Sequence, residues 1–119
     1  MPLQTLKFGD HVLSQHYSAK GLAVGDGGKS VVYFDAGTVS VDPPSIAATS
    51  KGTVTVTIPR AATGDLVFLT PPDTLEAGLV FVGAAVTSAN TVTIALYNTT
   101  AAAIDGIART WSYLLLRVA

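Results

Sequence analysis

The chain has 119 residues and no cysteine, so its length fits one domain, and neither a disulfide framework nor a thiolate metal site is expected. Hydrophobic residues make up 49% of it and charged residues only 13%, with a net charge of −1. The sequence has no Lys/Arg cluster, which argues against a nucleic-acid surface. A surface so poor in charge favours association with other chains.

Membrane insertion is not expected either. No apolar run approaches the roughly 18–20 residues of a membrane-spanning helix. The opening MPLQTLKFGDH lacks the basic segment followed by an apolar segment that defines a secretory signal.

Residues 1–44 are predicted to be an extended N-terminal arm with short strands. The first 30 residues hold both histidines and an apolar set with no sustained period, namely Leu3, Leu6, Phe8, Val12 and Leu13. The turn at Gly25–Gly28 and the strand-like residues around it indicate a hairpin. Two short strands are then expected, Val31–Phe34 and Thr38–Val41, and the Pro-Pro pair that follows ends the second.

From residue 45 onward the pattern is regular. Thr53–Pro59 alternates strictly, which predicts a strand with its valines and isoleucine inward and its threonines outward. A turn at Ala62–Asp65 leads into a strand at Leu66–Thr70, and Asp73–Gly78 crosses to the next strand, Leu79–Thr87.

Two further strands complete the pattern. A short turn, Ser88–Asn90, leads into Thr91–Asn98, with Val92, Ile94 and Leu96 inward. The Ala-rich segment Thr99–Ile107 fits one helical turn or a loop, and the last strand runs from about Arg109 to Val118. Short strands about ten residues apart predict an all-β fold, an antiparallel β-sandwich of jelly-roll type over residues 45–119.

Two of these strands are apolar on both faces. In Leu79–Thr87, strict alternation places Leu79, Phe81 and Ala85 on one face and Val80, Val82 and Val86 on the other. The last strand sets Trp111, Tyr113 and Leu115 against Leu114, Leu116 and Val118. Because a sandwich buries one face of each strand, the second apolar set predicts contact with another chain.

The sequence contains no strong catalytic, metal-binding or phosphate-binding motif. The segment GDGGKS (Gly25–Ser30) lacks the first glycine of a phosphate-binding loop and precedes a strand-like run, so it is interpreted as a hairpin turn. His11 and His16 lack a third metal ligand, and Asp73 and Glu76 fit a turn better than a glycosidase pair. The sequon at Asn98 is given no weight. We expect no catalytic residue, no metal site and no cofactor.

Four aromatic residues leave two interpretations open. Trp111, Tyr113, Tyr97 and Tyr33 fit anchors of a core or interface, and exposed aromatic rings on a sandwich also stack on sugars. The anchor interpretation is favoured.

The stretch Gly52–Arg117 resembles tailed-bacteriophage virion proteins. The matching pieces are IP-x-A-x-x-GD at Ile58–Asp65, the hairpin V-x-S-A-N-T-V-x-I-x-L-Y-N at Val86–Asn98, and A-x-D at Ala103–Asp105. Such segments are typical of small trimeric β-sandwich modules in capsid decoration (cement) proteins, head fibres and tail fibres. These modules carry no catalytic residues, so none is transferred to this chain.

The resemblance implies a non-enzymatic homotrimer, assembled in the host cytoplasm, that binds the major capsid protein on the outer surface of the virion and stabilises the head. The trimer interface is expected at Leu79, Phe81, Gly83, Ala85, Leu114 and Leu116, and the capsid contact at Leu3, Leu6, Phe8, Val12 and Leu13. The alternative is a short head- or tail-fibre module that binds a host-surface carbohydrate. A surface cap needs no long shaft, and the length of the chain favours it.

Overall fold

The computed structural model describes residues 30–119, and the expectations for the arm residues Leu3–Leu13, for both histidines and for most of the GDGGKS turn lie outside them. The chain divides into two compact units. The larger is Asp35–Leu115; of the smaller, residues 30–34 and Leu116–Ala119 are described.

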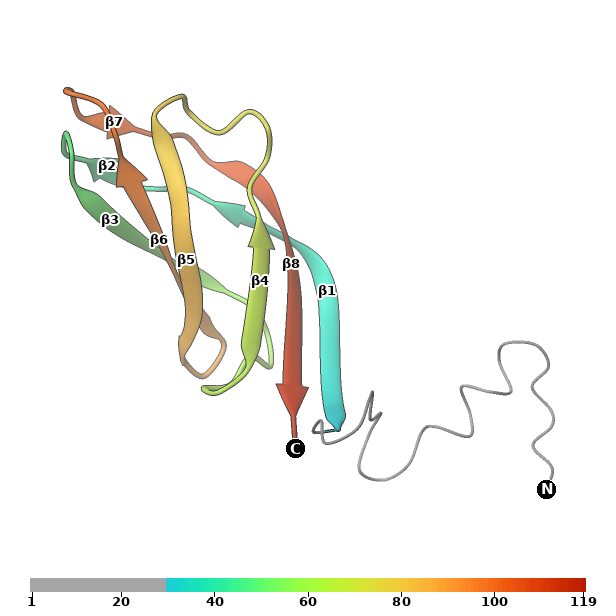
Figure 1. Cartoon of the computed structure of the whole chain (residues 1–119). Coiled ribbons are helices and arrows are strands. Elements are labelled where there is room, and N and C mark those ends of the chain that lie inside the picture. Colours follow the sequence, from blue (N-terminus) through green and yellow to red (C-terminus); the bar gives the residue numbers. More distant parts are fainter. Residues whose placement is uncertain (1–29) are drawn as a thin grey trace, which may run out of the picture. The chain divides into compact units, whose positions relative to one another are not determined.

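The described residues form strands and no helix (Figure 1). The strands are β1 (Val31–Val41), β2 (Ser45–Ile46), β3 (Lys51–Thr57), β4 (Leu66–Thr70), β5 (Leu79–Ser88), β6 (Thr91–Asn98), β7 (Ile104–Asp105) and β8 (Arg109–Val118). They make two three-stranded sheets, β1-β8-β4 and β3-β6-β5, and a short β2-β7 pair. The all-β prediction and the antiparallel sandwich are confirmed. The jelly-roll topology and the arm stay predictions.

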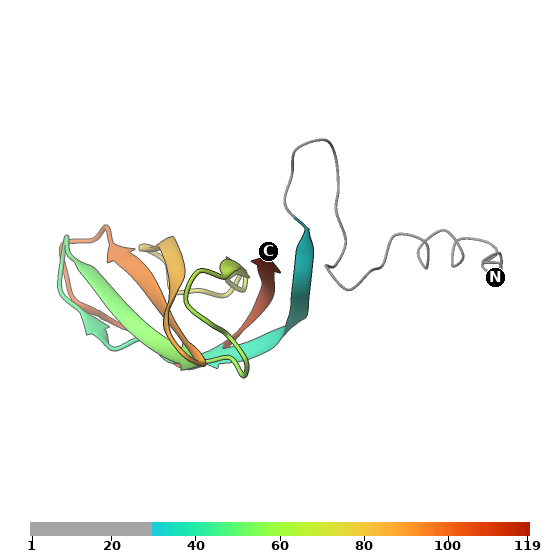
Figure 2. The same ribbon diagram turned by 90° about the horizontal axis from the view of Figure 1, so that it is seen from below.

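The sheet β3-β6-β5 contains the most regular sequence. β6 pairs antiparallel with β3 on one side and with β5 on the other, and Figures 1 and 2 show the three strands side by side in one layer. As predicted, Val92, Ile94 and Leu96 point inward and are at most 1% exposed, while the threonines of β3 lie outside. Branched side chains fill the inner face of the pleat, and hydroxyls cover the outer face.

The core lies between the two large sheets. Phe81 of β5 meets Trp111 of β8 edge to face, with ring centroids 5.4 Å apart and an interplanar angle of 87°. Trp111 and Leu115 are fully buried, and Leu114 on the opposite face of β8 is 36% exposed. In Figure 1, β4 lies between β8, its sheet neighbour, and β5 of the other sheet.

The prediction for the two faces of β5 was wrong beyond Val82. A β-bulge lies between Phe81 and Gly83, so Phe81 is opposite Leu96 and Gly83 is opposite Ala95, with Val82 as the extra residue. An extra residue reverses the alternation that follows it. Val86 is therefore buried and Ala85 exposed, the reverse of the expected placement.

One other segment differs from expectation, and another confirms one of two alternatives. The two short strands expected at residues 31–41 are one continuous strand, β1, since Asp35-Ala36-Gly37 stays extended. Part of it, from Asp35 onward, belongs to the larger unit. The Ala-rich segment is a loop without a helical turn, and it holds the two-residue strand β7, which pairs with β2.

Turn residues adopt the conformations their chemistry favours. Gly64 has φ 95° in the predicted turn, where the Asp65 carboxylate accepts a hydrogen bond from the Ala62 amide at 3.0 Å. Asn90, at φ 61°, lies in the turn of the β5-β6 hairpin and accepts a bond from the Arg60 amide at 2.8 Å. Asparagine tolerates this left-handed conformation and bonds to nearby backbone at little cost.

Candidate interaction surface

Asn98 is a buried polar residue with hydrogen-bond partners, whereas the indole nitrogen of Trp111 is buried without one among the described residues. Asn98, at the end of β6, is fully buried. Its amide nitrogen donates to the carbonyl oxygens of Ile46 at 3.0 Å and Ala102 at 2.8 Å. Its amide oxygen accepts from the backbone amide of Thr100 at 2.8 Å and from the hydroxyl of that residue at 2.7 Å. Asn98 thus joins β2, β6 and the loop before β7, and in the folded chain its side chain is not accessible for glycosylation.

Glu76 also holds two segments together. Its carboxylate accepts a bond from the Ile107 amide at 3.0 Å and pairs with the Arg109 guanidinium at 3.1 Å. The hydrogen bond from Arg109 is the largest cause that lowers the pKa of Glu76, followed by the bond from Ile107. A carboxylate held ionised in this way suits a structural clamp between the loop before β5 and the start of β8, and it does not suit a general acid.

Metal-ligand groups do not gather in this part of the chain. Among residues 30–119, no group of three or more His, Cys, Asp or Glu side chains could hold a metal ion. The same residues contain no helix that could cross a membrane.

The four aromatic candidates differ in exposure. Trp111 is fully buried, so it cannot stack on a sugar. The Tyr113 hydroxyl donates to the Asp35 carboxylate at 3.0 Å, and Tyr33 lies under the Arg117 guanidinium, 4.9 Å from its ring centroid. Tyr97 is 37% exposed on the outer face of β6.

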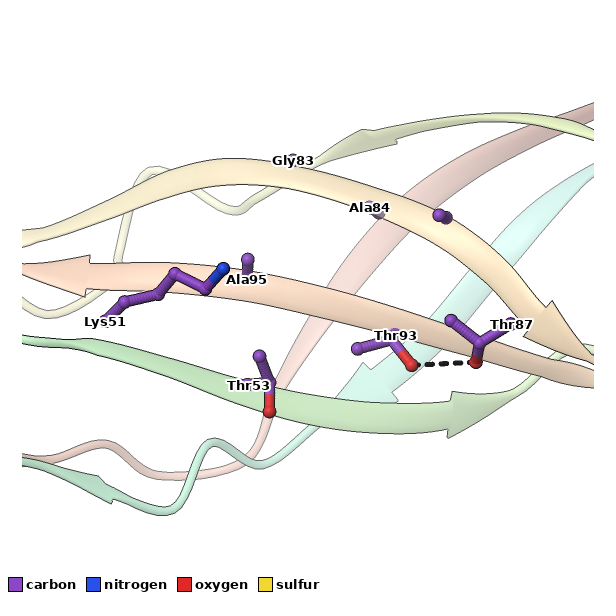
Figure 3. Close-up of a pocket in the computed structure, with 8 residues that line it drawn as sticks. Lys51, Thr53, Gly83, Ala84, Thr87, Thr93 and Ala95 are labelled. Carbon is purple, nitrogen blue, oxygen red and sulfur yellow. Dashed lines mark hydrogen bonds between the residues drawn. The ribbon is translucent and has the colours of Figure 1, made fainter.

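We call the outer side of the β3-β6-β5 sheet the hydroxyl face. In cross-strand register it presents Thr53, Ala95 and Gly83 in one row and Thr55, Thr93 and Ala85 in the next. Because the bulge turns these small β5 residues outward, the face has a shallow hollow of about 290 Å³, with Gly83, Ala84, Ala85 and Ala95 among its lining (Figure 3).

Polar side chains surround this hollow. The hydroxyls of Thr87 and Thr93 bond to each other at 2.8 Å, and Thr53 lies on the opposite side. Lys51 extends over Ala95 (Figure 3). Gly83 lies in open space, since a Cβ atom built on it would meet no atom of another residue within 4 Å. The hollow is therefore accessible and can hold a small apolar group.

We call the outer side of β4 and β8 the apolar face. It exposes Leu66 (49%), Phe68 (53%) and Leu114 (36%). Phe68 and Leu114 line a second shallow depression together with Thr70, Ser112 and Tyr113. Large apolar side chains left exposed together on one sheet face favour a protein contact.

The predicted interface residues fall into four places. Leu79 (7% exposed) and Phe81 face the core. Gly83 and Ala85 lie on the hydroxyl face, and Leu114 lies on the apolar face. Leu116 is half-buried and belongs to the smaller unit. The interface assignment stays a prediction. The sequence analysis did not name Leu66 and Phe68 as surface residues. Their alternation with Val67 and Leu69 was the signal that could have shown it.

No protein-family model, curated protein or solved structure matches the chain.

Proposed function

We propose that this chain is a non-enzymatic structural protein of a tailed-phage virion, a homotrimer that binds the outer surface of the capsid and stabilises the head. The observation that carries the proposal is the apolar face, with Leu66, Phe68 and Leu114 exposed on a chain that has 13% charged residues. A protein that worked as an isolated monomer would cover such a face with charged side chains. The resemblance of Gly52–Arg117 to virion modules indicates which assembly it joins.

In this proposal the two parts of the chain have different tasks. The sandwich associates with its own copies, and residues 1–44 contact the major capsid protein through Leu3, Leu6, Phe8, Val12 and Leu13. Each copy bound across a seam between capsid subunits adds buried apolar area, at about 25 cal/mol per Å². The added area raises the barrier to opening of the seam.

The carbohydrate alternative has less support. It needs an exposed aromatic ring, and Trp111 is buried while Tyr33 is covered by Arg117. Among the four aromatic residues considered for this role, Tyr97 is the exposed one, in register with Lys51 and Val80. A glycan array on which the protein binds a sugar, with loss of the signal in Tyr97→Ala, would favour this alternative.

Two measurements test the proposed function. Phage particles whose genome encodes the chain are purified, and an antibody to the protein is used with gold particles in electron microscopy. We expect gold on the outside of the head, and absence of the protein from these particles by mass spectrometry would contradict the proposal.

The arm is tested in the full chain. Substitution of Leu3, Leu6 and Phe8 by serine should abolish binding to capsids stripped of the protein, and the oligomer should persist in native mass spectrometry. Substitution of Gln4, Thr5 and Gln15 by serine is the matched control and should leave capsid binding unchanged. If the apolar triple variant binds as well as the control, the arm does not make the contact.

A further inference from the structure

The strand β3 is an open edge of its sheet. It pairs with β6 on one side, and among the described residues no strand pairs with it on the other. Figure 3 shows β3 at the border of the sheet, with β6 between it and β5. Ile46 of β2 packs on Gly52, where a Cβ atom would come within 2.6 Å of its side chain, and this contact lies on the inner face of the strand. The edge of β3 beyond Gly52 is therefore available for a further strand.

The hydrogen bonds to β6 show which backbone groups point to this edge. The Asn98 N–H donates to the Ser50 carbonyl oxygen at 2.9 Å, and the Ile58 N–H donates to the Asn90 carbonyl oxygen at 3.0 Å. Bonded and non-bonded pairs alternate along an antiparallel ladder, so the even-numbered residues of β3 bond to β6. The backbone groups of the alternate residues point away from β6, and within the described part of the chain they have no backbone partner; these residues are Lys51, Thr53, Thr55 and Thr57.

Little in β3 prevents a second strand from pairing there. Proteins protect edge strands with proline, bulges or inward charges. The register of β3 with β6 is continuous, and Lys51–Thr57 contains no proline. The one charge of the strand is Lys51, at its first position, with its side chain on the hydroxyl face. The edge is thus competent for strand addition over Thr53–Thr57.

The sequence of this edge fits a second copy of itself. Thr53–Thr57 reads TVTVT, the same in both directions. In an antiparallel pair centred on Thr55, threonine lies opposite threonine on the outer face and valine opposite valine on the inner face, and such cross-strand pairs are favourable. Val54, which is half-buried at the edge, would gain cover from Val56 of the second copy.

The backbone groups are in phase with the same register. Pairing centred on Thr55 places the free N–H and C=O groups of the three threonines opposite one another, so each threonine pair exchanges two hydrogen bonds. No charged residue lies within Thr53–Thr57, so the pairing brings no like charges together. Sequence symmetry and hydrogen-bond phase therefore select the same arrangement.

We propose that two copies of this chain pair through β3, antiparallel and centred on Thr55, so that their β3-β6-β5 sheets join into one six-stranded sheet. The contact is isologous, with the same residues on both sides. It uses the free edge of β3 in both copies, so this contact joins two copies and no more.

The contact is small, and its strength comes from main-chain hydrogen bonds. A strand pair over Thr53–Thr57 covers much less than the roughly 800 Å² from each partner that a stable dimer buries. We therefore expect the pair to separate in dilute solution and to form where copies are held close together. A test must trap the pair covalently.

Cysteine substitution provides this trap, because the chain has no cysteine of its own. Thr55 is exposed and lies opposite its own copy in the proposed pair. Opposite residues of a hydrogen-bonded pair have Cα atoms about 5.5 Å apart, which is within the range of a disulfide. Under mild oxidation, Thr55→Cys should form a disulfide-linked dimer on a non-reducing gel.

Two neighbouring positions test the register. Thr53→Cys and Thr57→Cys are also exposed, but each thiol lies about 13 Å along the strand from the same thiol of the other copy, beyond the reach of a disulfide. Each variant alone should therefore stay unlinked. An equimolar mixture should form a linked dimer, because position 53 of one copy lies opposite position 57 of the other.

Ala101→Cys, at an exposed loop position, measures linkage by random collision. Thr55→Cys should link at least roughly tenfold faster, because pairing raises the effective concentration of its thiol. Circular dichroism should show the same strand content in every variant. The pair is overturned if Thr55→Cys links no faster than Ala101→Cys, if Thr53→Cys alone links as fast as Thr55→Cys, or if the mixture stays unlinked.

This inference goes beyond the proposed function and can fail separately from it. The pair uses none of the residues expected at the trimer interface, and in the virion it would join a copy of one trimer to a copy of another. Linked pairs of a protein that is absent from phage heads would retain the pair and contradict the capsid role. A protein that labels the heads, with Thr55→Cys unlinked, would do the reverse.

Discussion

The two large sheets contain similar apolar strands and place them differently. β4 keeps strict alternation, so Leu66 and Phe68 remain outside. β5 breaks its alternation at Val82, and the residues that reach its outer face afterwards are Gly83 and Ala85. One extra residue in a strand thus decides whether large or small side chains reach the outer face. The hydrophobic content of the strand alone does not predict this outcome.

A charge at position 86 should have the largest effect, and it tests the faces that the bulge gives to β5. Val86→Asp places a carboxylate at a buried position, whereas strict alternation without the bulge would place residue 86 outside. We expect a loss of about 3 kcal/mol or more in the free energy of unfolding, because the carboxylate would be buried without a partner. Urea unfolding followed by circular dichroism measures it.

The matched control is Ala85→Asp. It adds the same charge at the neighbouring exposed position of β5, so the change should stay within about 1 kcal/mol. Equal losses in the two variants would show that the bulge does not set the faces of β5.

A pair of phenylalanine substitutions sharpens the comparison. Phe81→Ala removes the ring that packs on Trp111 between the sheets and should lower the free energy of unfolding by about 2 to 3 kcal/mol. Phe68→Ala, on the apolar face, should change it by less than about 0.5 kcal/mol at concentrations where the chain is a monomer. The comparison fails if the two losses are equal.

The two large sheets also differ in a buried polar group. Asn98 lies at the end of β6, beside the β2-β7 pair. Asn98→Ala in β6 would leave the carbonyl oxygens of Ile46 and Ala102 and the amide of Thr100 without that partner. We expect a loss of about 2 kcal/mol, because buried groups would lose their hydrogen bonds. Thr99→Ala, at the exposed neighbouring position, is the control in the same urea titration and should lose about half as much or less.

Substitution of Glu76 should change the free energy of unfolding least, and the change should depend on pH. Its pKa in the folded chain is lowered by Arg109 and Ile107, so its contribution is present above the unfolded pKa and is lost as the pH falls through the folded pKa. Glu76→Gln should cost at most about 1 kcal/mol near neutral pH, since the ion pair is partly exposed. The difference from wild type should shrink between about pH 5 and pH 2.

Asp73→Asn serves as the charge-matched control for Glu76→Gln, because it also removes one negative charge from the same loop and Asp73 is exposed. It should leave the stability near neutral pH unchanged. A Glu76→Gln difference that stays constant into acid would contradict the lowered pKa.

Local pattern predicted most of the strands. Leu66–Thr70, Thr91–Asn98 and Arg109–Val118 were expected where they lie, because alternation and turn residues are encoded within a few positions. The strand expected at Thr53–Pro59 lies two residues earlier, at Lys51–Thr57. The bulge at Val82 was not predicted, since the alternation LVFVGAAV is equally regular without it. The strand β7 was missed because two residues carry no period.

The candidate surface was predicted only in part. Gly83, Ala85 and Leu114 were expected at an interface, and the structure places them on outer faces, while Leu79 and Phe81 point inward. The role of Asn98 depends on Ile46, 52 residues away, and on Ala102. No local pattern indicates a partner at that separation.

Trp111 is the single tryptophan of the chain. It belongs to β8, is fully buried and touches Phe81 of the opposite sheet. Its indole fluorescence is therefore an intrinsic optical probe of the distance between the sheets. A red shift of the emission would report that the layers have separated, without any label and in either oligomeric state.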